Sequence, residues 1–257
     1  MRHIRPRPSE PVSLAVPLLL AAGSLSLLAL VWRRISAPRI ERTLSRGGTE
    51  RSRAGAPPTI SSRAAEITPH AQLAPAGSGP LVHRRYDVLI TGCTLPASAL
   101  LRTLQRNLSA LAPAALAHFE KSQGSDGLAR VGDEYDITML GPWNGRVRVI
   151  ESTPRQFTLV TLDGHPEAGH ITFSVAETGE FTETLQVLIE SWARARDSVV
   201  ALAYGTLGVG KQMQTEVWIT FLQRLSALAG MDHTPEVRIA TEEIAVEDIP
   251  PLPGLDA

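Results

Sequence analysis

Three side chains with the potential for chemistry lie within six residues of one another: His165, Glu167 and His170. Imidazole and carboxylate groups transfer protons in many enzymes, and together they also suit zinc or iron. The spacing matches no established metal site, so we expect no metal and no cofactor. His165 and Glu167 remain candidates for a catalytic or ligand-gating role. The alternative is a turn shaped by Gly164 and Pro166, in which Glu167 binds main-chain amides or an arginine.

A glycine-rich segment at residues 205–212 comes within one residue of a phosphate-binding P-loop, G-x-x-x-x-G-K-[ST]. Gln212 replaces the hydroxyl that would bind magnesium, and no apolar run ending in Asp follows. We therefore interpret these glycines as the entry to a helix. Arg194 and Arg196 alternate at the end of a predicted strand. Either could hold a carboxylate or phosphate ligand if that face borders a pocket, and solvent exposure is the alternative.

The elements that must position these groups follow from hydrophobic periodicity and turn residues. Residues 96–120 carry leucine and alanine at helical spacing, broken at Pro113, which predicts two short helices. Residues 209–229 predict one long amphipathic helix. Alternation and turns predict strands at 83–93, 134–140, 146–151, 157–162, 169–176, 181–192 and 198–204.

Short turns between successive strands imply an antiparallel meander, and the long helix must bury its apolar side on that sheet. The predicted class is therefore α+β, a helix-grip fold with a curved antiparallel sheet of about seven strands around a long C-terminal helix. Such a sheet commonly leaves a cavity beneath the helix. The predicted ligand-pocket residues are Ile171, Phe173, Leu185, Val187, Ile189, Met213, Val217 and Phe221.

This layout resembles the helix-grip (SRPBCC) superfamily of lipid-transfer, polyketide-cyclase and pollen-allergen-like proteins. Within it, residues 157–175 are similar to the bacterial and plant domain-of-unknown-function family 1990. The resemblance covers roughly residues 83–230, and His170 departs from it because an acidic residue is usual there. It implies a fold and a possible pocket, not a reaction. The matching residues are Thr161, Leu162, Gly164, His165, Pro166, Glu167, Gly169 and Phe173.

The flanking segments divide the chain into five parts. Residues 1–11 form a short tail, and residues 12–32 are an uncharged apolar stretch bracketed by arginines. A helix of that length reaches about 31 Å, which matches a bilayer core of about 30 Å and predicts a transmembrane helix. A cleaved signal peptide is the alternative. Residues 33–81 predict a disordered Arg/Ser/Pro/Ala-rich linker, 82–232 the folded domain, and 233–257 an acidic disordered tail.

Charge indicates where the domain lies. Six arginines follow the apolar stretch within about 20 residues and three precede it, which favours a single-pass cell-membrane protein with a cytoplasmic domain. Residues 1–54 carry a net charge of +7 and the remainder −8. An acidic domain argues against a nucleic-acid partner. A single cysteine excludes a disulfide framework, and the excess of arginine over lysine is typical of GC-rich bacterial genomes.

These features predict a membrane-tethered domain that binds a small hydrophobic or amphipathic ligand between its sheet and its C-terminal helix. One alternative is a protein-interaction module with a filled core, whose protein partner is unknown. The other is a cyclase- or hydrolase-like enzyme that uses His165 and Glu167.

Overall fold

The computed structural model describes residues 40–46, 69–140, 144–178, 183–198, 200 and 209–244. All of these described residues belong to one compact unit, which falls within residues 39–257. The predicted transmembrane helix at 12–32 lies outside the described residues, as does most of the predicted linker. None of the helices described is both long and apolar enough to cross a membrane.

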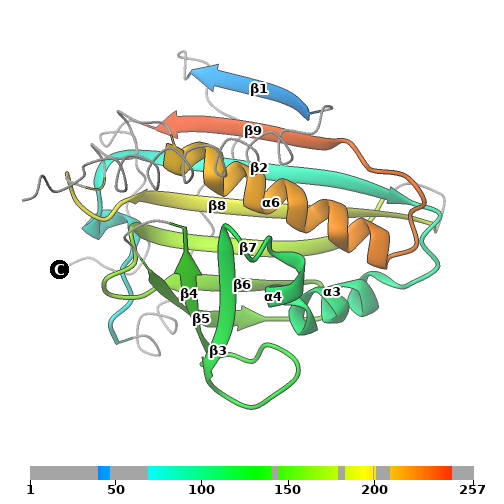
Figure 1. The fold of residues 1–257 in the computed structure, drawn as a ribbon, viewed down its shortest axis with the longest axis horizontal. Helices are drawn as coiled ribbons and strands as arrows, with labels where there is room; N and C mark the ends of the chain where they lie inside the picture. Colours follow the sequence, from blue (N-terminus) through cyan, green and yellow to red (C-terminus); the bar gives the residue numbers. More distant parts are fainter. Residues whose placement is uncertain are drawn as a thin grey trace, which may run out of the picture. The chain divides into compact units, whose positions relative to one another are not determined.

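One large sheet dominates the fold (Figure 1). Within the described residues nine strands pair in the order β1-β9-β2-β8-β7-β6-β5-β4-β3. All neighbouring strands are antiparallel except β1 and β9, which run parallel. The strands are β1 (Ile40–Arg46), β2 (Ser78–Thr91), β3 (Ala117–Gln123), β4 (Glu134–Met139), β5 (Gly145–Ser152), β6 (Gln156–Thr161), β7 (Glu167–Glu177), β8 (Thr184–Ala195) and β9 (Val237–Ile244).

In the part of the chain that the structure describes, the α-helices lie against one face of the sheet (Figure 1). The chain leaves β2 through α3 (Ala97–Arg106) and α4 (Leu108–Leu111), reaches the far edge at β3, and returns strand by strand to β8. The long helix α6 (Val209–Leu228) then leads to β9, on the other side of β2. This is the arrangement of a helix-grip fold, so the predicted class is confirmed at that level, with more strands than expected.

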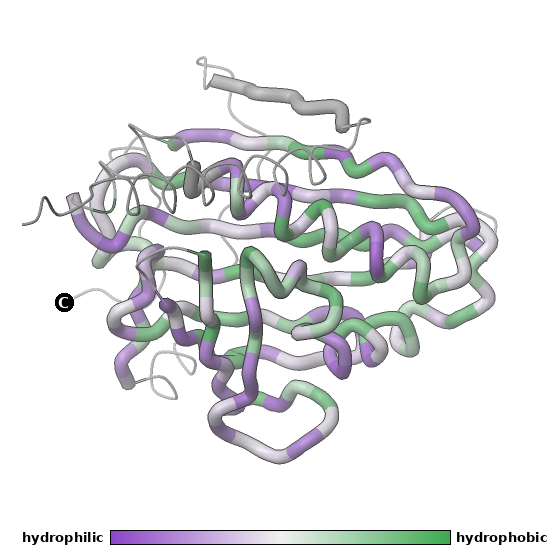
Figure 2. Tube along the Cα trace, in the orientation of Figure 1, coloured by the Kyte–Doolittle hydropathy of each residue, from purple (hydrophilic) through white to green (hydrophobic). Residues whose placement is uncertain are grey.

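The core lies between the helices and the inner face of the sheet, which is the face that they cover. In β2 the hydrophobic residues gather in the second half of the strand (Figure 2), while burial largely alternates along β2 and β8, as expected for strands with one face in a core. Aromatic rings fill the centre. Phe157 and Phe173 stack with ring centroids 4.7 Å apart, and Phe173 lies 5.5 Å from Trp218 and 5.8 Å from Phe221 of α6.

Two edges of the domain extend further than the sequence pattern indicated. The predicted linker, 33–81, contains strand β1, a short 3-10 helix, η1 (Ala74–Ala76), and the start of β2. The predicted tail, 233–257, contains β9. In β9, Val237 and Ile239 are buried while Arg238 and Ala240 are exposed, so a short alternation outweighs the acidic composition of the segment.

Two predicted elements inside the domain also differ from the structure. The second predicted helix gives way to β3, because the chain turns at Pro113 and then alternates, with Ala117 and Phe119 buried. The expected strand at 198–204 does not begin at Ser198, where the backbone is helical. Most of that segment lies outside the described residues.

Candidate functional site

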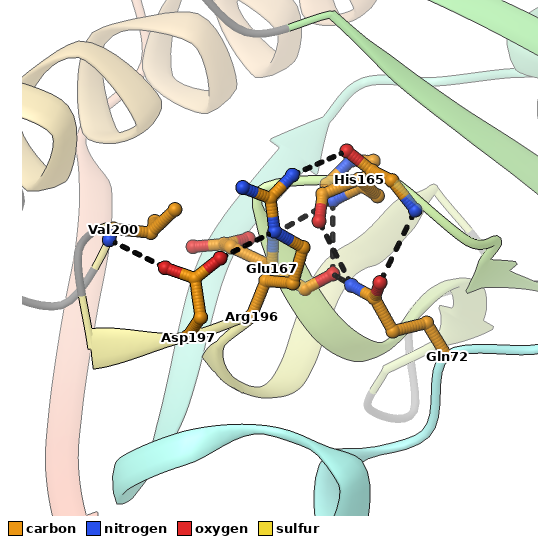
Figure 3. Close-up of polar contacts among 7 residues, drawn as sticks. Gln72, His165, Glu167, Arg196, Asp197 and Val200 are labelled. Atoms are coloured by element: carbon orange, nitrogen blue, oxygen red, sulfur yellow. Dashed lines mark hydrogen bonds and ion pairs between the residues drawn. The ribbon is translucent and has the colours of Figure 1, made fainter.

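His165 is held in the turn before β7 by main-chain contacts (Figure 3). The Glu167 N–H donates to His165 Nδ1 at 3.0 Å, so we assign Nδ1 as an acceptor. Gln72 donates to the carbonyl oxygens of both residues at 2.8 Å. The imidazole packs so closely on Gly145 that a Cβ there would collide with the ring. Burial lowers the pKa of His165 to about 4, so the ring is neutral at pH 7.

The carboxylate of Glu167 points away from this ring. Its Oε2 accepts a hydrogen bond from Gln214 Nε2 of α6 at 2.9 Å. Burial raises the pKa of Glu167, while Arg84 and the Gln214 hydrogen bond act in the opposite direction. Glu167 therefore links the end of β7 to α6, whereas His165 shapes the turn before it.

The third residue of this cluster, His170, lies on the outer face of the sheet. His170 is opposite Trp192 of β8, whereas Glu167 is opposite Ala195. Side chains alternate between the two faces along a strand, so Glu167, three residues before His170, points to the inner face. Burial lowers the pKa of His170 to about 4. Three or more metal-ligating side chains do not converge anywhere in the part of the chain that the structure describes.

A cavity of about 270 Å³ opens at the ends of β2, β7 and β8. Most of its wall is apolar or main chain, and its charged groups come from four strands. Its lining residues are Ser78, Gly79, Pro80, Val82, Arg84, Pro166, Glu167, Ser191, Ala193, Arg194, Ala195, Val200 and Glu243.

Arg84 is the most unusual group in this wall. It lies on β2 opposite Ser191 of β8 and Thr241 of β9, and it is only 6% exposed. By contrast, Arg194, which also lines the cavity, donates to the carbonyl oxygen of Gly79 at 2.7 Å. The cavity thus places a buried cation, the Glu167 carboxyl and the Ser191 hydroxyl among apolar walls.

The eight predicted pocket residues do not line this cavity. Six of them are buried in the packed core. The other two, Ile171 and Met213, are half-buried. The six are Phe173, Leu185, Val187, Ile189, Val217 and Phe221.

The two arginines predicted as possible anion-binding groups have protein partners. Arg194 donates to Gly79, and Arg196 donates from Nε to Asp197 at 2.7 Å and from Nη1 to the Gly164 carbonyl at 3.0 Å (Figure 3). Sequence reasoning did not single out Arg84. The signal that could have identified it was its position in the strand. Arg84 lies two residues before the buried Tyr86, so both side chains point to the same face.

Comparisons with known proteins add structural likenesses only. No family model matches the chain, and neither does any curated protein. It is similar to norcoclaurine synthase from Thalictrum flavum, with a TM-score of 0.41 and 13% identity over 59% of this chain and 96% of that one. A conserved protein from Geobacillus kaustophilus gives a TM-score of 0.37 and 13% identity over 60% and 98% of the two chains. Similarity to the domain-of-unknown-function family 1990 stays a prediction.

Proposed function

We propose that this helix-grip domain binds a small amphipathic ligand in the cavity at the ends of β2, β7 and β8. The observation that carries the proposal is the composition of the cavity wall. Pro80, Val82 and Ala193 offer apolar surface beside three polar groups of low exposure: Arg84, Glu167 and Ser191. Binding sites for small molecules typically combine apolar walls with a few placed polar groups.

The proposed site lies at one end of the sheet and not beneath the middle of α6. Phe157, Phe173, Trp218 and Phe221 bring their rings into contact there and occupy the space that a central ligand would need. A volume of about 270 Å³ is close to the lower limit of ordinary ligand sites, which favours a small molecule or one end of a longer one.

Ligand uptake by the full chain in phosphatidylcholine nanodiscs tests this proposal. Native mass spectrometry should detect a retained small molecule, and isothermal titration should detect binding of octanoate above the empty-nanodisc blank. Ala193→Phe places a ring in the cavity and should abolish uptake. Ala240→Phe, on an exposed position of β9, is the matched control. Equal uptake by wild type and Ala193→Phe would refute the site.

A protein-interaction module is the second candidate function. The aromatic packing around Phe173 supports it, because a filled centre provides a rigid body without a central ligand chamber. Failure of the wild type to take up any amphiphile would favour this candidate. An enzyme based on His165 and Glu167 has weaker support, since the imidazole binds the main chain of Glu167 while the carboxylate binds Gln214.

We also propose that residues 12–32 tether the domain to the cell membrane on the cytoplasmic side. The support is the uncharged apolar stretch itself and the excess of arginines after it. The full chain should remain in the membrane fraction after carbonate extraction, and deletion of 12–32 should release it. Release of the intact chain by carbonate would refute the tether.

A further inference from the structure

Arg84 occupies a position where strands normally carry apolar residues. It shares the inner face of β2 with Val82, Tyr86 and Val88, and the latter two are fully buried. Its neighbour Arg85 faces outward, with a side chain 47% exposed, and lies 3.7 Å from Glu190. The strand therefore places one arginine in solvent and the next in the interior.

The guanidinium of Arg84 has no hydrogen bond or ion pair with any residue that the structure describes. Other buried or half-buried arginines in this domain do have such partners. Arg148 donates to Glu134 at 2.6 Å, and Arg194 donates to the carbonyl oxygen of Gly79 at 2.7 Å. A buried charge without a partner is costly, because desolvation is not offset. Arg84 departs from this rule while it lines a cavity.

The guanidinium of Arg84 suits an anion, and it does so in a wall that also carries the carboxyl groups of Glu167 and Glu243. The guanidinium carries five N–H donors and no acceptor, and its planar fork matches carboxylate and phosphate oxygens. Ser191 lies directly opposite Arg84 on β8 and also lines the cavity. The carboxyl of Glu167 is close enough for Arg84 to affect its pKa, yet it forms its hydrogen bond with Gln214. Glu167 therefore leaves the donors of Arg84 open to a ligand.

We infer that Arg84 is the receptor for an anionic head group, a carboxylate or a phosphate, on the amphipathic ligand. This inference rests on the proposed function, because it assigns the polar end of the ligand in the same cavity. The apolar part of the ligand then lies along Val82, Pro80 and Ala193. A charge-assisted bidentate contact of this kind raises affinity by about tenfold to a hundredfold over an uncharged head group.

Titration of the full chain in nanodiscs with four compounds tests the inference: octanoate, octyl phosphate, octanol and inorganic phosphate. Octanoate or octyl phosphate should bind at least about tenfold more tightly than octanol. Arg84→Gln should reduce binding of the anionic amphiphiles to the octanol level and leave octanol binding unchanged. Arg85→Gln, which removes the outward arginine of the same strand, should behave as wild type.

The outcomes separate the inference from the proposed function. Equal binding of octanol and octanoate by wild type would overturn the role of Arg84 and leave the proposed function standing. Binding of inorganic phosphate as tight as that of octyl phosphate would support the anion receptor and refute an amphipathic ligand. No binding of any compound would refute both. Arg84→Lys keeps the charge, so it should retain a preference for anions even if Arg84→Gln fails to fold.

Discussion

Acidification should destabilise this domain through His165, and the structure gives the size of the effect. The imidazole is buried against Gly145 and accepts the Glu167 N–H on Nδ1. Protonation would place a charge where water is excluded, and this cost outweighs the hydrogen bond that Nδ1–H would donate to the Glu167 carbonyl oxygen at 3.0 Å. The main cause of its lowered pKa is burial, to which Arg196 adds a smaller electrostatic contribution.

The free-energy change follows from the two pKa values of this side chain. The pKa is about 4 in the fold and about 6.5 in the unfolded chain, so the unfolded state binds more protons between these values. Stability contributed by His165 is therefore present at pH 7 and is lost as the pH falls. The loss is about 2 kcal/mol at pH 5 and about 3 kcal/mol at pH 4.

Urea unfolding of wild type and His165→Asn from pH 7 to pH 4 measures this effect. Asparagine keeps an oxygen that accepts the Glu167 N–H and removes the titrating ring. The variant should be less stable at pH 7 by about 1–2 kcal/mol, because it leaves space beside Gly145. Its disadvantage should vanish or reverse near pH 4. The lowered pKa of His170 affects both proteins equally and cancels in the difference.

A matched control is His233→Asn, which removes a histidine whose side chain is 65% exposed and should leave the shape of the curve as in wild type. A constant difference between wild type and His165→Asn across the whole pH range would refute the reasoning. It would mean that the turn does not keep this imidazole neutral.

Three further perturbations have defined outcomes in the same unfolding assay. Burial raises the pKa of Glu167 above its ordinary value of 4.5, so this side chain stabilises the fold below pH 4.5 and that stability is lost as the pH rises. Glu167→Gln should therefore be more stable than wild type at pH 8 but not at pH 4. Equal curves would contradict this. Phe221→Ala should cost about 3–5 kcal/mol and leave octanoate affinity unchanged, whereas lost affinity would place the ligand in the centre. Arg224→Ala removes three hydrogen bonds to the end of α4 and should cost about 1–3 kcal/mol; an unchanged midpoint would show that water replaces them.

The sequence predicted the elements with long, regular periodicity. Helix α6 and strands β4 to β8 carry enough apolar positions for their periods to be recognised, and their positions agree with the structure within a few residues. Strand β3 has only two buried apolar positions, Ala117 and Phe119, and it follows a leucine-rich helical segment. Strand β9 is equally short of apolar positions, so composition masked its pairing with β2.

The site was harder to predict than the fold, because it depends on which inner-face positions remain unfilled. The spacing of apolar residues places Phe173 and Phe221 on the faces of β7 and α6 that point toward each other. Only the tertiary packing reveals that aromatic rings occupy the space between these faces. Arg84 belongs to a pair of adjacent arginines, a pattern typical of an exposed segment. Its neighbours in register, Ser191 and Thr241, are more than 100 residues away in sequence, so local patterns could not identify its surroundings.

The position of β2 between β9 and β8 has a consequence for synthesis of the protein. This strand emerges from the ribosome early, yet both of its hydrogen-bonding neighbours, β8 and β9, are translated much later. Until then the nascent chain presents a long strand with open edges, a known route to aggregation. A premature stop codon before Val237 would leave the β9 edge of β2 unpaired, so the eight residues of β9 protect that edge of the strand.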